Sequence, residues 1–197
     1  MIRRRSKQRT RSIRIAGLLA LVSLSSPVLA QECDRACLAG LMTQFIDALV
    51  AHDPSGLPLA DDVRYTEDSR LAELGEGIWQ SVTSNGGFRQ DYIDTREQVI
   101  GSHVLLHEDD VQVLYSVLLH VSGREIAGIE TLVQRVSPDG RFQPTELGAP
   151  IRGMNDPVPS GMKNSREEMT RIALTYPAGL RVGNFTDGGT PFAPSTY

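Results

Sequence analysis

The chain has 197 residues, of which 22% are charged and 40% hydrophobic, enough for one domain with an appendage. Its formal charge is −4, but seven of the 20 basic residues and none of the 24 acidic residues lie in residues 1–30. Without that segment 13 basic residues stand against 24 acidic ones, a charge of −11. This balance argues against nucleic acid or an anionic membrane surface as a partner.

Residues 1–30 have the pattern of a secretory signal peptide. A basic stretch precedes an apolar run at 15–24, and small residues lead to the expected cleavage position after Ala30. The apolar run is too short for a membrane span. We therefore expect a secreted or periplasmic protein that makes no membrane contact once the leader is removed.

Cys33 and Cys37 are the only cysteines of the chain. Four positions apart on a helix, their Cα atoms would lie about 6 Å from each other, within the range of a disulfide. In an oxidising compartment we expect them to pair. A metal or redox centre is the alternative interpretation.

The chain before the sheet is expected to be mainly helical. Apolar residues at helical spacing predict a helix over 34–51, and a Pro/Gly segment ends it. A short helix or turn at 57–61 and a brief strand at 63–67 should follow. A further helix is expected over 71–82, weakened by two glycines, and it carries Trp79, the only tryptophan.

Four extended segments follow, and the whole fold is organised around them. They cover residues 88–94, 99–108, 111–121 and 125–136, and short turns with Asp, Gly or Pro separate most of them. Their β-branched residues and regular spacing predict an antiparallel meander. Because such a sheet twists, one face can become concave, and the first helix should cover it. The expected fold class is α+β.

The last part of the chain is predicted to be a loop-rich extension. A capping-box pattern at Ser165 to Glu168 predicts a helix that runs to about Tyr176 and ends before Pro177. We expect three regions: a leader at 1–30, a domain at 31–142 and an extension at 143–197. A short echo of the first helix in the extension raises the alternative that it is a partial second copy.

The order of these elements resembles the nuclear transport factor 2-like superfamily, and especially its SnoaL-like branch. Residues 45–53 are similar to the way those domains begin, and residues 123–131 are similar to their closing strand. The resemblance covers about 34–136. It implies a cone-shaped α+β barrel, often dimeric through the sheet, with a pocket under the helices. Members include polyketide cyclases, ketosteroid isomerase and binding proteins, so the resemblance leaves the activity open.

Glu130 is the first candidate for acid–base chemistry, because apolar residues flank it on the last segment. Buried there, it would serve as a general base or acid. The alternatives are that it pairs with an arginine such as Arg89 or faces water. His120 could face Glu130 across a hairpin, and such a pair can move a proton near neutral pH. A structural histidine is the alternative role.

Further candidates come from the other strands. Asp94 stands at a strand end near the expected mouth of the pocket, as a base or a turn residue, and His103 is a second candidate partner. His103 and His107 would lie about 13 Å apart on a strand, too far to share a metal, so we expect no metal and no cofactor. Four aromatic side chains could stack on a ring-shaped ligand or form plain core: Tyr65, Trp79, Tyr92 and Tyr115.

The leading prediction is a secreted domain that binds a small organic molecule in a pocket inside the cone. The first alternative is a cofactor-independent isomerase, cyclase, dehydratase or hydrolase, with Tyr65 or Tyr92 as proton donor. A buried Glu130 beside His120 would favour it. The second alternative is an assembly module that forms a homodimer without a ligand. An apolar outer face on residues 111–121 would favour that.

Overall fold

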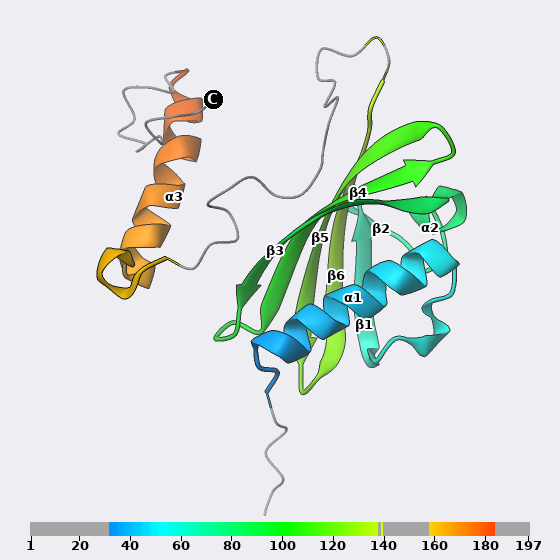
Figure 1. Ribbon diagram of the computed structural model, residues 1–197, viewed down its shortest axis with the longest axis horizontal. Helices are drawn as coiled ribbons and strands as arrows, with labels where there is room; N and C mark the ends of the chain where they lie inside the picture. Colours follow the sequence, from blue (N-terminus) through cyan, green and yellow to red (C-terminus); the bar gives the residue numbers. More distant parts are fainter. Residues whose placement is uncertain (1–31, 138, 140–157, 184–197) are drawn as a thin grey trace, which may run out of the picture.

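The computed structural model describes residues 32–137, 139 and 158–183 (Figure 1). The expected leader and much of the expected extension lie outside these residues. Within them, no helix is both long and apolar enough to cross a membrane. The elements, in chain order, are α1 (Arg35–Ala51), the 3-10 turn η1 (Pro54–Gly56), β1 (Leu59–Glu67), β2 (Arg70–Leu71), α2 (Ile78–Ser81), β3 (Ser84–Asp94), β4 (Val99–Glu108), β5 (Val111–Ser122), β6 (Glu125–Arg135), the 3-10 turn η2 (Ser160–Met162) and α3 (Arg166–Arg181).

The strands form one curved sheet in the order β2-β1-β6-β5-β4-β3. The expected meander is confirmed, since β3 to β6 pair antiparallel in sequence. β1 joins it in parallel with β6, with Tyr65 opposite Ile129, so the sheet is mixed rather than purely antiparallel. Parallel neighbours need a long connection, and here the whole meander supplies it. The α+β class is confirmed.

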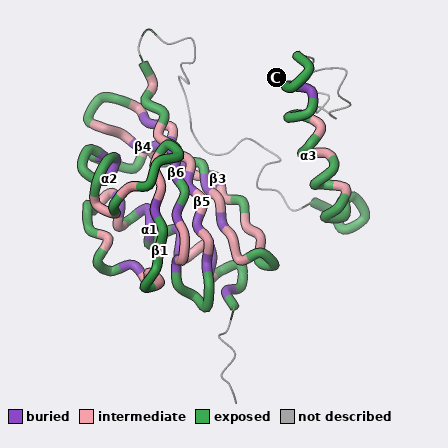
Figure 2. The backbone as a smooth tube through the Cα atoms, turned by 180° about the vertical axis from the view of Figure 1, so that it is seen from behind, coloured by how far each residue is buried: buried purple, intermediate pink, exposed green. Residues whose placement is uncertain are grey.

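α1 lies across the concave side of the sheet (Figure 1). We call the sheet face toward α1 the inner face and the opposite one the outer face. Buried and less buried residues alternate along the strands, as Figure 2 shows from behind. Trp79 meets Phe45 of α1 edge-on beneath the helix, with ring centroids 5.5 Å apart. The largest fully buried side chains include Trp79, Tyr115, Phe45, Leu38 and Met42.

The start of α1 is held in two ways. The Asp34 side chain caps the helix by accepting a hydrogen bond from the Cys37 backbone N–H at 2.8 Å. The expected disulfide between Cys33 and Cys37 is present, with Cα atoms 5.2 Å apart. Gln98, in the β3–β4 turn, accepts from the Cys33 N–H at 2.7 Å and donates to the Cys33 carbonyl at 2.9 Å. This turn therefore fixes the disulfide against the sheet.

Two predictions between α1 and β3 are wrong. Residues 57–61 form no helix, because β1 already begins at Leu59, opposite Ile126 of β6. The helix expected over 71–82 is reduced to the four residues of α2. Gly75 and Gly77 explain this, since both have a positive φ that interrupts a right-handed helix.

Gly77 allows a close contact at the start of α2. The Glu67 carboxylate accepts hydrogen bonds from the Ile78 N–H at 3.1 Å and from the Tyr65 hydroxyl at 2.8 Å. A Cβ atom at Gly77 would collide with that carboxylate. The loop can therefore close over Glu67 only with glycine at this position.

α3 begins as predicted but ends later. The Ser165 side chain accepts from the Glu168 N–H at 3.1 Å, which confirms the cap. The predicted end before Pro177 is wrong, because α3 continues to Arg181 with the proline inside. A proline removes a single N–H donor, and the helix continues on its other hydrogen bonds. The division into domain and extension, and a partial second copy, stay predictions.

Arg166 attaches α3 to the sheet domain. Its guanidinium lies 2.6 Å from an Asp94 carboxylate oxygen and 3.3 Å from one of Glu97. Asp94 ends β3, and Glu97 lies in the following turn. The same turn contains Gln98, which binds the backbone of Cys33. The Arg166 hydrogen bond is the largest influence that lowers the pKa of Asp94 to about 2.

Replacing Gly77 by alanine should lower the free energy of unfolding by about 2 kcal/mol, because φ is +60° and the new methyl group meets the Glu67 carboxylate. Gly40→Ala is the matched control, because its site in α1 is open and alanine favours a helix by about 1 kcal/mol. Urea unfolding of both variants measures the difference. Equal losses in the two variants would contradict the assigned role of Gly77.

Replacing Arg166 by alanine should raise the pKa of Asp94 from about 2 toward the ordinary value of 3.8 for this side chain. The folded-state pKa lies below the unfolded one, so the contact stabilises at pH above about 4 and is lost as pH falls toward 2. A carbon-detected NMR titration of the carboxyl groups measures it. Arg171→Ala, which removes a partner of Glu168 within α3, should leave Asp94 unchanged. No change in the Arg166 variant would refute the contact.

Candidate functional site

A hollow of about 620 Å³ lies on the outer face of the sheet. We call it the outer hollow. Six of its lining residues carry the argument that follows: Tyr92, His103, Ser116, Leu118, Glu130 and Leu132. They come from β3, β4, β5 and β6, so four neighbouring strands build the site.

Strand register explains how these residues meet. Tyr92 stands opposite Gly101, Gly101 opposite Leu118, and Leu118 opposite Glu130, so the four form one row across the sheet. Paired residues share a face. Gly101, in the middle of the row, has no side chain to fill the space between Tyr92 and Leu118. A Cβ atom there would lie 3.4 Å from the Leu118 side chain.

One part of the outer hollow is apolar and exposed. Leu132 is 55% exposed and Tyr92 48% exposed, and Leu118 lies between them in partial burial. The ring of Tyr92 meets the His103 ring edge-on, with centroids 5.5 Å apart. Exposed apolar side chains that line a concave surface are typical of a ligand-binding site.

The other part is polar. His103 Nδ1 lies 2.9 Å from the Ser116 hydroxyl oxygen, which orients the imidazole ring. His120 Nε2 lies 2.8 Å from Glu130 Oε1, so the predicted approach of these two side chains across the β5–β6 hairpin is present. Hydrogen-bonding groups thus stand at two places around the apolar patch.

Glu130 is not buried, although the acid–base role depended on its burial. Its side chain is 62% exposed, and that of His120 is 44% exposed. Alternation places Ile129 and Thr131 on the inner face beneath α1, and Glu130 therefore points outward. An exposed carboxylate lacks the low-dielectric surroundings that the proposed acid–base role required.

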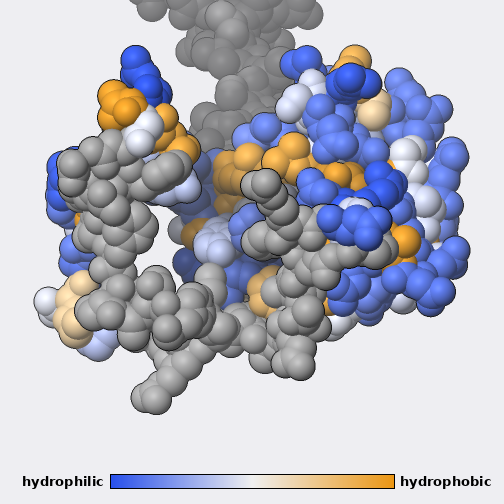
Figure 3. Space-filling view, turned by 90° about the horizontal axis from the view of Figure 1, so that it is seen from above, coloured by the Kyte–Doolittle hydropathy of each residue, from blue (hydrophilic) through white to orange (hydrophobic). Residues whose placement is uncertain are grey.

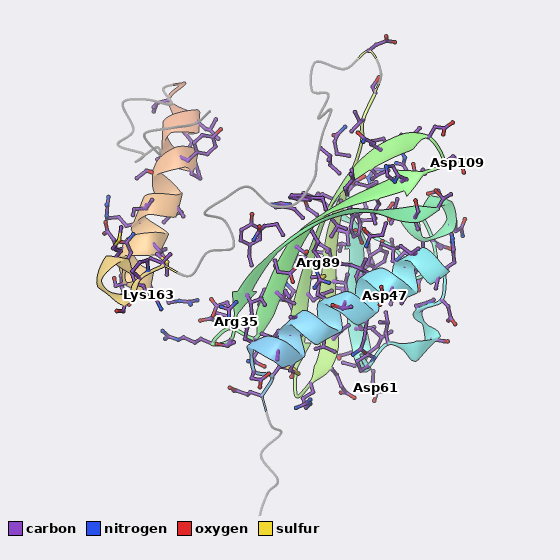
Figure 4. All side chains as sticks on the ribbon, in the orientation of Figure 1. Arg35, Asp47, Asp61, Arg89, Asp109 and Lys163 are labelled. Carbon is purple, nitrogen blue, oxygen red and sulfur yellow. A yellow bond between two sulfur atoms is a disulfide. The ribbon has the colours of Figure 1, made fainter. Side chains whose placement is uncertain are left out.

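Arg89 is not the partner of Glu130. It lies toward α1 (Figure 4), where it donates to the Thr43 hydroxyl at 2.8 Å. It forms its ion pair with Asp91, at 2.8 Å. Glu130 therefore faces water, as one alternative held, and it pairs with His120 instead of an arginine.

The four candidate aromatic residues lie on two sides of the sheet. Tyr92 borders the outer hollow, while Tyr65, Trp79 and Tyr115 are at most 3% exposed and belong to the inner core. Burial raises the pKa of Tyr65 and of Tyr115 above the usual range of tyrosine. The pocket expected under the helices is, at these three residues, packed core.

Sequence reasoning missed two residues near the predicted ones. Glu67 binds the Tyr65 hydroxyl, and the alternation of a strand could have shown that residues two apart share a face. Arg166 binds Asp94, which borders the outer hollow. Nothing local in the sequence indicates that second contact.

No metal site is found in the described part of the chain, where no three potential ligands gather. His103 and His107 lie on one strand as expected. Ser84 stands beside His107, with its hydroxyl 3.5 Å from the Nδ1 atom.

No family model matches this chain, and no curated protein matches it. Among solved structures, the chain is similar to a designed protein with a curved β-sheet, at 17% identity and a TM-score of 0.41, over 52% of this chain and 88% of that one. It is also similar to a protein provisionally named a ketosteroid isomerase from Kribbella flavida, at 19% identity and a TM-score of 0.40. That match covers 57% of this chain and 94% of the other.

A designed protein with a nuclear transport factor 2 fold is similar at 13% identity and a TM-score of 0.37, over 55% of this chain and 90% of that one. These likenesses concern the fold and carry nothing about what this chain binds. The strand order, the parallel β1–β6 pair and α1 across the concave face agree with the α+β arrangement expected from the sequence.

Proposed function

We propose that this chain binds a small organic molecule with an apolar ring and a hydrogen-bonding group in the outer hollow. The observation that carries the proposal is the gathering of Tyr92, Leu118 and Leu132 around a concavity of about 620 Å³. Ligand sites in proteins have volumes of about 300–1,000 Å³ and combine apolar walls with few polar groups. The outer hollow has this composition.

The two parts of the outer hollow suggest the class of ligand. A ring could lie against Tyr92 and Leu118, because Gly101 leaves the sheet bare between them. A donor group on the ligand would reach the Glu130 carboxylate, which already accepts from His120 at 2.8 Å. The mature chain is acidic, so a neutral or cationic molecule fits better than an anion.

Proton transfer is a second candidate function, and the contact between His120 and Glu130 favours it. Glu130 lines the outer hollow, and its carboxylate is within reach of a bound molecule. A carboxylate that touches a C–H group next to a carbonyl could remove that proton, with His120 as its partner. Both side chains are largely exposed, so a bound ligand would have to exclude water first.

An apolar outer face on β5 would favour the assembly alternative. The outward positions of this strand are mixed, because Leu114 and Leu118 alternate with Gln112, Ser116 and His120. A homodimer through this face stays a prediction. Ligand binding would compete with it, because both would use the same surface.

Leu132→Ala should weaken the binding of a ring probe such as 2-naphthol about fivefold to tenfold, because a leucine side chain in contact contributes about 1–1.5 kcal/mol. Leu71→Ala is the matched control, since Leu71 is 69% exposed on β2 and does not line the outer hollow. Amide shifts in a proton–nitrogen NMR titration measure the affinity. We expect the shifted amides to include Tyr92, Gly101 and Leu118.

Equal affinity of the two variants, or shifts centred on Phe45 and Trp79, would contradict binding in the outer hollow. The second outcome would return the ligand to the interior of the cone.

Glu130→Gln tests the second candidate. If the protein exchanges the protons next to the carbonyl of cyclohexanone in heavy water, the variant should lose most of that exchange, because an amide cannot act as the base. NMR follows the exchange, and urea unfolding of the same variant should change by less than about 1 kcal/mol for an exposed pair. Exchange that persists in the variant would exclude Glu130 as the base.

A further inference from the structure

α3 carries an apolar stripe that is partly exposed. Met169, Ile172 and Leu180 recur at spacings that place them on one side of the helix, together with Tyr176. Met169 is 53% exposed and Leu180 47% exposed. Leu174 is 61% exposed but points elsewhere, since it lines a crevice with Arg96. We call Met169, Ile172, Tyr176 and Leu180 the α3 stripe.

The beginning of α3 is anchored beside the outer hollow. Arg166 lies 2.6 Å from Asp94, and Asp94 itself lines the outer hollow. Glu97 adds a second acidic contact at 3.3 Å. The anchor is therefore a double ion pair at one end of the helix.

The dimensions of the two surfaces agree. The outer hollow extends from Tyr92 on β3 to Leu132 on β6, three strand spacings, or about 14 Å. From Arg166 to Tyr176 the helix rises about 15 Å. A helix that pivots at Arg166 and crosses β4 and β5 toward β6 would therefore lay the α3 stripe across the hollow.

Both surfaces are apolar where they would meet. In the view from above, apolar surface is seen on α3 and on the sheet domain (Figure 3). Leu132 and Tyr92 are among the most exposed apolar residues of the domain, as Met169 is in α3. Burying these groups against each other removes apolar area from water on both sides.

We propose that α3 closes over the outer hollow of its own chain, pivoting on the contact of Arg166 with Asp94 and Glu97 and seating the α3 stripe against Leu118 and Leu132. The structure then represents the open arrangement, with the anchor made and with Met169 and Leu180 of the stripe exposed. Closure covers the surface that a ligand or a second copy would use. The proposal does not depend on whether the hollow takes a small molecule.

Disulfide trapping on the full chain tests the closure. In the variant with Leu118→Cys and Ile172→Cys, mild oxidation should cross-link the two positions within one chain. The matched control combines Leu118→Cys with Leu174→Cys, which lies off the stripe, and should cross-link at least fivefold less. Peptide mapping by mass spectrometry distinguishes the new bond from Cys33–Cys37, and the intact mass distinguishes one chain from two.

Adding Arg166→Ala to the Ile172 variant should lower the yield several-fold, because the pivot is lost. Equal yields in the Ile172 and Leu174 variants would overturn the proposal. A cross-link that joins two chains would also overturn it, in favour of exchange of α3 between copies.

A second measurement covers the case in which a cysteine variant does not fold. Met169→Asp should place a charge in the closed interface and shift the amide signals of Tyr92, Leu118 and Leu132 toward an open form. Leu174→Asp should leave these signals in place. Absence of any difference between the two aspartate variants would refute closure.

Discussion

The packing of Trp79 and Phe45 beneath α1 determines how the rest of this molecule can be used. Their rings meet edge-on in a core whose largest members are fully buried, and this core occupies the concave side of the sheet. A cone filled in this way has no unused apolar wall at these residues. The opposite face carries the outer hollow, where Gly101 keeps the centre of the sheet bare. The same sheet thus supports the packed core on one side and the outer hollow on the other.

Much of the fold could be predicted because its signals are local. The bounds of β4 agree with the predicted segment, and β6 ends one residue early, since turn residues punctuate both strands. Between α1 and β3 the strand at 63–67 lies within β1, but the two helix predictions were wrong, because two glycines with positive φ and the pairing of Leu59 with β6 override helical propensity. The pairing of Leu59 with Ile126 cannot be predicted from the local sequence, because the two residues are far apart in the chain.

The sequence showed which site residues share a face of the sheet, but it did not show which face lies toward α1. Alternation correctly grouped Glu130 with Leu132 and separated them from Ile129, yet it could not say which group faces inward. That choice depends on the side to which α1 packs, which is a tertiary property. The contact of His120 with Glu130 was accessible because a short hairpin joins their strands, whereas Arg166 lies 72 positions from Asp94.

The parallel pairing of β1 with β6 has a consequence for the order of folding. The Thr131 hydroxyl donates to the Thr66 carbonyl at a sequence separation of 65, so the first strand has no sheet neighbour of any length until the last strand has been made. Contacts of this range slow folding and leave an edge open to other chains. β1 carries exposed charges at Asp61, Asp62 and Arg64. Such charges disfavour pairing of this strand with the strands of other, partly folded chains.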